Sequence, residues 1–268
     1  MSSPHGMPPE VDPEVPSAAR VYDYYLGGRH NFASDRRMGD RALAKWPSLP
    51  RIMQANRAFL RRAVRYATAR GIHQFLDIGS GIPTAGNVHE VAQDADPAAR
   101  IVYVDRDPVA VAHSRTILDA TRGTGVVQAD FTDPDAVLTD PVTRAVLDLD
   151  RPVAVLLVAL LHFVGDALEP WRALTRYRAA MAPGSLLVIS HASAEGDPDH
   201  ADEHAELYRN AGTPMTMRSR DEVSTFFDGF ELVDPGVVYL PLWRPDAPDA
   251  AAGSPERFTG YAAVGRRV

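Results

Sequence analysis

The residue types that could do chemistry gather at the ends of two apolar segments. Residues 75–78 form a short apolar run that contains Asp77, and the turn Gly79–Gly81 follows at once. About 25 residues later the apolar run 101–104 ends on Asp105. A buried parallel strand that passes into a glycine turn lets a nucleotide-like ligand approach the backbone closely. Two strands that each end near an aspartate predict a site for a ligand that has a ribose and a charged tail.

The glycine turn by itself leaves other interpretations open. A dinucleotide-binding fingerprint needs a third glycine three residues after Gly81, and Thr84 stands at that position. The fingerprint is therefore incomplete, and an acid just ahead of the turn is not part of it. The turn could also be a tight strand-to-helix connection that binds nothing.

The composition is typical of an enzyme with a sizeable core. The chain has 268 residues, of which 45% are hydrophobic and 24% charged, enough for one large domain or two small ones. It has no cysteine, which excludes disulfides, cysteine nucleophiles and thiolate metal sites. No apolar run approaches the roughly 20 residues of a membrane span. Residues 1–16 are rich in proline and lack a signal pattern, so we expect a disordered tail on a cytoplasmic protein.

The charge is distributed unevenly along the chain. The net charge is −7, but residues 20–70 hold 12 Lys+Arg against 3 Asp+Glu, a balance of +9 that leaves −16 for the remainder. One interpretation is that a basic helical segment packs on an acidic core. The other is that the segment lines a pocket for an anionic substrate or touches nucleic acid.

The segment 17–70 is predicted to be helical. Apolar residues recur at helical spacing over 17–26, after Ser17 as a cap, and Gly27-Gly28 ends the run. Two further helices are expected at 33–45 and 51–69, separated by the prolines of 46–50. We expect these helices to form an N-terminal cap.

From Ile72 onward the chain alternates between strands and helices. Strands are expected at 74–78, 101–105, 125–130, 153–161 and 186–190, with helices at about 85–94, 108–121, 134–147 and 166–181. Five such units predict a parallel, doubly wound α/β sheet. The segments 230–233, 237–240 and 260–265 have no helix between them, which predicts a terminal antiparallel hairpin.

The acids and glycines together resemble a known family. Asp77-x-Gly79-x-Gly81, Asp105 and Asp130-Phe131, after three successive strands, resemble the class I S-adenosylmethionine-dependent methyltransferases, as do residues 181–185. The stretches 20–32, 74–81 and Asn56-Arg57-x-Phe59-Leu60 are similar to an actinobacterial methyltransferase-like family of poorly known function. The resemblance begins at Ala18. It implies a Rossmann-like seven-stranded sheet over 71–268, with five βα units and a terminal antiparallel hairpin, forming one globular unit with the 17–70 helical cap.

The resemblance implies S-adenosylmethionine as the cofactor and gives several residues a role. Gly79, Ser80 and Gly81 would lie along its methionine moiety, with Asp77 near the amino group. Asp105, beside Arg106, would accept hydrogen bonds from both ribose hydroxyls, as a carboxylate can. The neighbouring Asp107 is the alternative ligand.

The adenine end is expected at the third strand. The resemblance implies that Asp130 bonds the exocyclic amine and that Phe131 lies beside the ring. Asp130 could instead be a helix-capping acid near Asp133-Pro134.

The N-terminal cap is expected to supply a loop that closes over the cofactor. Its candidate residues are Tyr22, Tyr25, Gly28, Arg29 and Asn31, because a guanidinium is a good partner for the cofactor's carboxylate. The alternative is that the two tyrosines, three residues apart, are core contacts of a helix.

In this fold the end of the fourth strand faces the transferred methyl group, which implies contacts from Val158, Ala159 and Leu160. His162 follows them and is the candidate general base for a hydroxyl or amine nucleophile. It could equally be a packed or hydrogen-bonded histidine, and His191 is a weaker candidate for the same role.

The segment 195–220 lies where this fold often carries a substrate lid, with Tyr208, Asn210 and Met215 as possible contacts. His200 and His204, four residues apart among acids, could share a helix face and bind a divalent metal. The pattern is not His-Glu-x-x-His, and a solvated acidic helix start is the preferred interpretation, so no metal is expected.

The predicted function is methyl transfer from S-adenosylmethionine to O or N of a small-molecule acceptor, leaving S-adenosylhomocysteine. The acidic balance and the absence of an Asn/Asp-Pro-Pro-Tyr/Phe motif argue against a nucleic-acid substrate. One alternative is a non-catalytic regulatory protein that binds S-adenosylmethionine or S-adenosylhomocysteine. The other is an RNA methyltransferase that uses the basic N-terminal segment.

Overall fold

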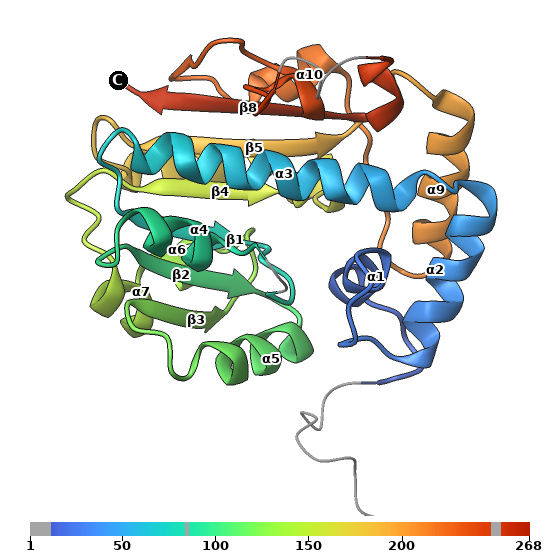
Figure 1. The fold of residues 1–268 in the computed structure, drawn as a ribbon, viewed down its shortest axis with the longest axis horizontal. Helices are drawn as coiled ribbons and strands as arrows, with labels where there is room; N and C mark the ends of the chain where they lie inside the picture. The colour runs from blue at the N-terminus through green and yellow to red at the C-terminus, as the bar shows by residue number, and fades with distance from the viewer. Residues whose placement is uncertain (1–11, 84–85, 248–252) are drawn as a thin grey trace, which may run out of the picture.

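The protein is built around one mostly parallel sheet (Figure 1). The computed structural model describes residues 12–83, 86–247 and 253–268. The strand order is β3-β2-β1-β4-β5-β8-β6, with β7 beside β8. The five parallel strands are β1 (Gln74–Ile78), β2 (Arg100–Asp105), β3 (Thr124–Gln128), β4 (Ala154–Val158) and β5 (Leu186–Ala192). Their carboxyl ends therefore meet at one edge of the molecule, where the two strands that end near an aspartate were expected to form a site.

The antiparallel end of the sheet is built around β8 (Gly260–Arg267), which pairs with β5. Two short strands, β6 (Phe230–Leu232) and β7 (Val238–Tyr239), both pair with β8 at successive positions. Together they occupy the place of one edge strand. The prediction of a Rossmann-like sheet with a terminal antiparallel hairpin is confirmed. In the described part of the chain the sheet has eight strands and not the expected seven, because β6 and β7 each pair with β8.

Both faces of the sheet are covered by helices. Successive residues of a strand point to opposite faces, and they belong to two separate hydrophobic clusters. Phe75 packs with α3 (Leu49–Thr68) and α4 (Val88–Ala95), whereas Leu76 packs on the opposite side. That opposite side is covered by α6 (Pro134–Leu138), α8 (Pro170–Ala180) and α10 (Arg220–Thr225). The helix α5 (Pro108–Leu118) follows β2.

Proline and left-handed residues shorten several expected elements. The single helix expected at 134–147 is two helices, α6 and α7 (Pro141–Val146), because Pro141 has no N–H to continue a helix. The fourth strand stops at Val158, since Ala159 takes φ +58°, and a turn of 3₁₀ helix follows at Leu161–Phe163. The helix expected from Asp166 is a 3₁₀ turn, Asp166–Leu168, and then α8, because Glu169 takes φ +49°.

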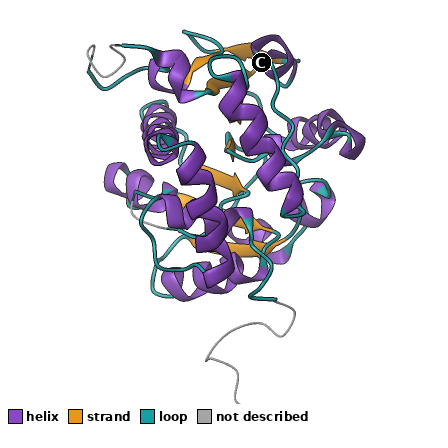
Figure 2. Ribbon diagram, turned by 90° about the vertical axis from the view of Figure 1, so that its right-hand side faces the viewer, coloured by secondary structure: helices purple, strands orange, loops and turns teal. Residues whose placement is uncertain are grey.

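The N-terminal helices α1 (Ala18–Tyr25) and α2 (Ala33–Lys45) lie at the carboxyl end of the parallel strands, together with α9 (Pro198–Asn210) (Figures 1 and 2). The longer α3 runs across a face of the sheet and shares its core. This packing supports one globular unit, and we keep the division into a 17–70 cap and a 71–268 domain as a proposal. No helix in the described part of the chain is long and apolar enough to cross a membrane.

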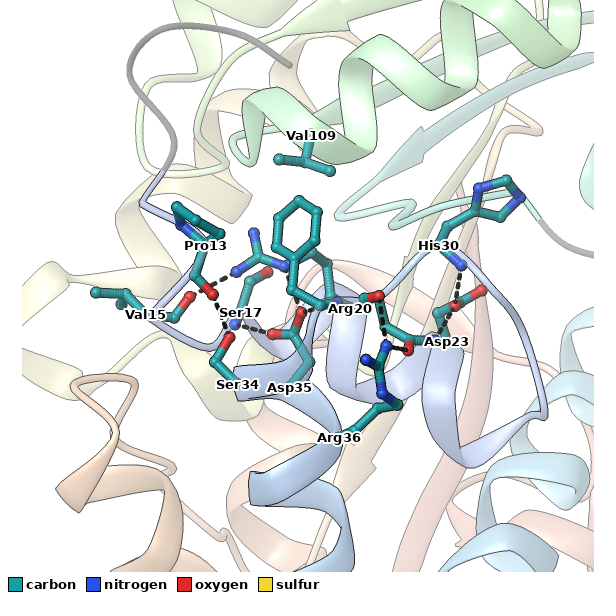
Figure 3. A network of polar contacts seen from close by, with 12 residues as sticks. Pro13, Val15, Ser17, Arg20, Asp23, His30, Ser34, Asp35, Arg36 and Val109 are labelled. Atoms are coloured by element: carbon teal, nitrogen blue, oxygen red, sulfur yellow. Dashed lines mark hydrogen bonds and ion pairs between the residues drawn. The ribbon is translucent and has the colours of Figure 1, made fainter. Parts of the chain in front are cut away.

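A buried ion pair fixes the segment that precedes α1 (Figure 3). The Arg20 Nε donates to Asp35 Oδ2 over 2.8 Å, and Arg20 Nη2 donates to the Val15 carbonyl over 2.6 Å. Ser34 Oγ donates to the Pro13 carbonyl over 2.5 Å. The sequence predicted a disordered tail over 1–16; residues 12–16 are described here with these contacts, and residues 1–11 lie outside the described part.

Candidate functional site

A cavity of about 410 Å³ lies at the carboxyl ends of β1 to β4, between the loops that follow them and the helices α1 and α3. Its volume falls within the range of small-molecule sites. It brings together most of the residues proposed from the sequence for the cofactor: Tyr22, Asp77, Gly79, Ser80, Gly81, Asp105, Arg106, Asp130, Phe131, Val158, Ala159 and Leu160.

The glycine turn after β1 forms one wall of this cavity. Gly79 and Gly81 take φ +71° and +64°, a left-handed conformation that favours glycine. A Cβ on Gly79 would lie 2.6 Å from Leu160 Cδ1, so the residue also permits close packing of the loop after β4. The Gly81 N–H donates to Asp105 Oδ2 over 2.7 Å, which joins the turn to the end of β2.

Asp77 is a buried carboxyl without an internal donor. Its side chain lines the cavity although the residue is only 7% exposed. Among the residues that the structure describes, none donates a hydrogen bond to it. Burial raises the pKa of Asp77 to about 7, an effect that the Arg57 charge partly offsets and the Asp105 charge increases. A ligand cation placed here would meet an unsatisfied acid.

Two arginines occur among the described lining residues of this cavity, Arg57 on α3 and Arg106 after β2. Arg57 is the one whose charge lowers the pKa of Asp77. Its Nη2 donates to Asn87 Oδ1 over 2.7 Å, and its buried Nε has no partner among the described residues. Arg29, the arginine proposed from the sequence, is exposed and does not line the cavity. Arg57 belongs to the motif Asn56-Arg57-x-Phe59-Leu60 that carried the family resemblance, so the signal was present without a role attached to it.

The two acids after β2 are used differently. Asp105 lies at the cavity and accepts N–H bonds from Gly81 and Asp107, and burial still raises its pKa to about 6 because it outweighs those bonds. Asp107 caps α5 by accepting from the Val109 N–H over 2.8 Å. Its other oxygen accepts from Ser17 Oγ and contacts Arg20. Asp107 therefore anchors α5 and α1, which leaves Asp105 as the better ribose candidate.

Asp130 and Phe131 follow β3 at the far end of the cavity. Asp130 Oδ1 accepts from the N–H and hydroxyl of Thr132, each over 2.8 Å. Burial alone would raise the pKa of Asp130, but these bonds and the Arg106 charge lower it. The cap of α6 is Asp133, so Asp130 is not the capping acid. Phe131 is buried against Tyr177, at 5.5 Å between ring centroids.

Several proposed residues lie outside this cavity. Tyr25 is in the core, as the alternative interpretation had it. Asn31 Nδ2 donates to Asp23 Oδ2 over 2.8 Å and to the Gly28 carbonyl over 3.0 Å. A Cβ on Gly28 would collide with the Asp23 carboxylate. The loop of Gly28, Arg29 and Asn31 is thus folded onto Asp23, which lines the cavity, whereas none of these three residues does.

A second, smaller cavity of about 80 Å³ adjoins the first. The two share five lining residues: Ala18, Tyr22, Asn56, Ala159 and Phe163. His162 and His191 line the second cavity, together with Tyr208 and Met215 from the segment predicted as a lid, whereas Asn210 does not.

The hydrogen bonds of His162 are at odds with the predicted general base. The Ala192 N–H donates to His162 Nδ1 over 3.2 Å, so the proton of the neutral ring is on Nε2. Burial and the neighbouring histidines lower the pKa of His162 well below its usual value. A ring held in this state offers a donor, not an acceptor, at Nε2.

The other histidines of this region are held by packing. His191 Nε2 accepts from Arg218 over 2.9 Å, and burial lowers the pKa of His191 to about 3. His200 and His204 both pack on the Trp46 ring. No group of three or more ligands that could hold a metal ion occurs among the described residues.

Comparison with known proteins gives a consistent result. A family model described as S-adenosyl methyltransferase matches residues 4–268. The chain is 41% identical to a DUF574 family protein of known structure from Streptomyces avermitilis, with a TM-score of 0.92, over 96% of this chain and 99% of that one. It is 42% identical to a candidate methyltransferase of known structure from Thermobifida fusca, with a TM-score of 0.91, over 97% and 98% of the two chains. No protein of curated function matches it.

Proposed function

The chain belongs to the S-adenosyl methyltransferase family, and from that premise we propose that its 410 Å³ cavity binds S-adenosylmethionine. The observation that carries the proposal is the buried Asp77 carboxyl, which lines the cavity and has no donor from the described residues. A buried acid of this kind is costly unless a cation or donor reaches it. The ammonium group of the cofactor's methionine part is such a cation.

Arg57 supplies the complementary charge. Its guanidinium lies close enough to Asp77 to lower the pKa of that carboxyl, and its Nε lacks an acceptor in the described part of the chain. An acid and an arginine that line one cavity match the ammonium and carboxylate of an amino acid. We assign the cofactor's carboxylate to Arg57 in place of Arg29.

The remaining cofactor residues follow the strand order. Asp105, whose two oxygens each accept one N–H bond, retains lone pairs for the ribose hydroxyls. Asp130 and Phe131 lie at the adenine end, where Asp130 remains ionised because Thr132 and Arg106 lower its pKa. When bound, the cofactor supplies an electrophilic methyl group; the residues of this chain orient it and exclude water.

We propose that the acceptor is a small molecule that enters through the second cavity. The shared lining residues place that cavity beside Ala159 and Phe163, at the end of β4. This adjoining space favours an enzyme over a protein that only senses the cofactor. The nucleophile is an O or N atom brought into position: its lone pair forms the bond to the methyl group as the methyl–sulfur bond breaks and S-adenosylhomocysteine leaves. Without a dedicated base, the proton of a hydroxyl or N–H acceptor passes to solvent.

Three of the basic residues in the 20–70 segment are not available to bind RNA. Arg20 pairs with Asp35 in the interior, and Arg62 donates to the carbonyls of Trp243 and Leu240. With Arg57 at the cavity, these arginines have structural or cofactor roles.

Calorimetric titration of two matched arginine variants with S-adenosylhomocysteine tests the proposal. We expect Arg57→Gln to weaken binding by roughly 10- to 100-fold, the value of about 1.5–3 kcal/mol for a charge-assisted bond. Arg29→Gln, which removes an equal charge from the surface, should bind like the wild type. Equal loss in both variants, or loss only in Arg29→Gln, would overturn the assignment, and absence of binding by the wild type would overturn the cofactor site itself.

A further inference from the structure

The second cavity is lined by apolar and uncharged polar residues. Among its described lining residues there is no aspartate, glutamate, lysine or arginine. Its apolar part comes from α3, the end of α2 and the segment after α9: Trp46, Leu49, Ile52, Met53, Met215 and Met217. A charged group entering this space would lose its hydration without meeting a group of opposite charge.

The histidines of the lining do not change this balance. Burial lowers the pKa of His204 to about 4 and that of His191 to about 3, and it holds the pKa of His162 well below its usual value. All three rings are therefore neutral near pH 7. Arg218, just behind His191, is already bonded to the Leu161 and Val164 carbonyls and to Asp166.

The other polar groups at the junction with the first cavity bond one another. Asn56 Nδ2 donates to Tyr22 Oη over 2.9 Å, and Ser190 Oγ donates to Asn56 Oδ1 over 2.6 Å. The Ala159 N–H donates to Ser190 Oγ over 2.9 Å. This chain of bonds fixes the junction and leaves the Nε2–H of His162 as a donor for an incoming molecule.

The size of the cavity limits what can enter. Its volume is about 80 Å³, whereas an apolar cavity of about 150 Å³ is known to accept benzene. A single ring fits only if side chains move aside. Met53, Met215 and Met217 are unbranched and flexible, which makes such an adjustment easy.

Resting on the proposed function, we propose that the second cavity admits an acceptor that is uncharged and largely apolar at its reacting end, no bulkier there than one ring. It rejects carboxylates and ammonium groups of the same size. A phenol-like hydroxyl or an unprotonated ring amine fits, with the donor on His162 directed at a lone pair of the acceptor.

Saturation-transfer NMR on the protein saturated with S-adenosylhomocysteine tests this selectivity, with phenol, benzoate and benzylamine as probes of similar size. We expect phenol to bind at least about tenfold more tightly than either ion, because neither ion meets a group of opposite charge among the described lining residues. Met215→Trp, which fills the cavity from an irregular segment, should weaken phenol binding. Leu168→Trp, at an exposed leucine outside the cavity, is the matched control and should not.

The outcomes separate the two proposals. Benzoate or benzylamine binding as tightly as phenol, phenol binding unchanged in Met215→Trp, or no probe binding at all would overturn the acceptor class while S-adenosylhomocysteine still binds. Failure of S-adenosylhomocysteine to bind would overturn the proposed function, and the acceptor class with it.

Discussion

Replacing Asp77 with asparagine is expected to stabilise the free protein and to weaken its hold on the cofactor. Burial raises the pKa of this carboxyl from the usual 3.8 to about 7, so the folded protein holds its proton more tightly than the unfolded chain does. Stability contributed by the protonated form is therefore lost as the pH rises from about 4 to about 7. At about 1.4 kcal/mol per pH unit, ionised Asp77 costs at most about 4 kcal/mol at pH 8.

The amide of asparagine and the protonated carboxyl are both neutral groups that lose hydration on burial, so these two costs largely cancel. We therefore expect Asp77→Asn to be more stable than the wild type by about 4 kcal/mol near pH 8 and by roughly 1.5 kcal/mol near pH 5. Urea unfolding of the free protein at both pH values measures this difference.

Binding should show the opposite trend with pH. An ammonium group beside Asp77 favours the carboxylate, so the cofactor must displace a proton below about pH 7. If the pKa of Asp77 falls well below 6 in the complex, the affinity of the wild type for S-adenosylhomocysteine drops about fivefold between about pH 7 and pH 6. Calorimetry in buffers of different ionisation enthalpy should detect proton release. If the affinity of the wild type for S-adenosylhomocysteine does not change with pH, or if Asp77→Asn binds it as tightly as the wild type, Asp77 does not bind the ammonium group as a carboxylate.

Three further changes test the site and the Arg20–Asp35 ion pair. Gly79→Ala should lose about 1–2 kcal/mol of stability and also bind S-adenosylhomocysteine more weakly, because its Cβ displaces the cavity side chain of Leu160. Gly27→Ala is the control: it lies at φ +77° with open space around it, so it should lose only stability on urea unfolding. Asp35→Asn should cost about 1.5–3 kcal/mol in urea unfolding, because the buried Arg20 loses its shortest contact to a carboxylate and keeps Asp107 and the Val15 carbonyl. Glu14→Gln, at an exposed ion pair, should have no measurable effect. Asp105→Asn should weaken binding about tenfold by calorimetry, since an amide accepts weaker hydrogen bonds from ribose than a carboxylate does; unchanged affinity would remove Asp105 from the site.

The parallel sheet could be predicted from the sequence because its signals are local. Continuous apolar runs are what strands buried on both faces require, and a glycine pair after Asp77 marks the turn. The positions of β1 and α2 follow the prediction residue by residue. The helix expected at 134–147 is interrupted at Pro141, because proline has no N–H to continue the helix.

The polar contacts of the site could not be predicted, because they depend on distances between segments far apart in the chain. Arg29 and Arg57 are the same residue type, and only the packing of α3 against the loop after β1 separates an exposed guanidinium from one in the cavity. The tautomer of His162 likewise depends on the backbone N–H of Ala192, thirty residues later. Residue types indicated the chemistry, and tertiary contacts decided which residues are placed to take part.

A crystal structure of the protein with S-adenosylhomocysteine is the most direct test of the cofactor site. We expect the carboxylate of the ligand to bind the Arg57 guanidinium, its ammonium group to bind Asp77 and its ribose hydroxyls to bind Asp105. A carboxylate bound by Arg29, or a ligand outside the cavity at the ends of β1 to β4, would contradict this assignment.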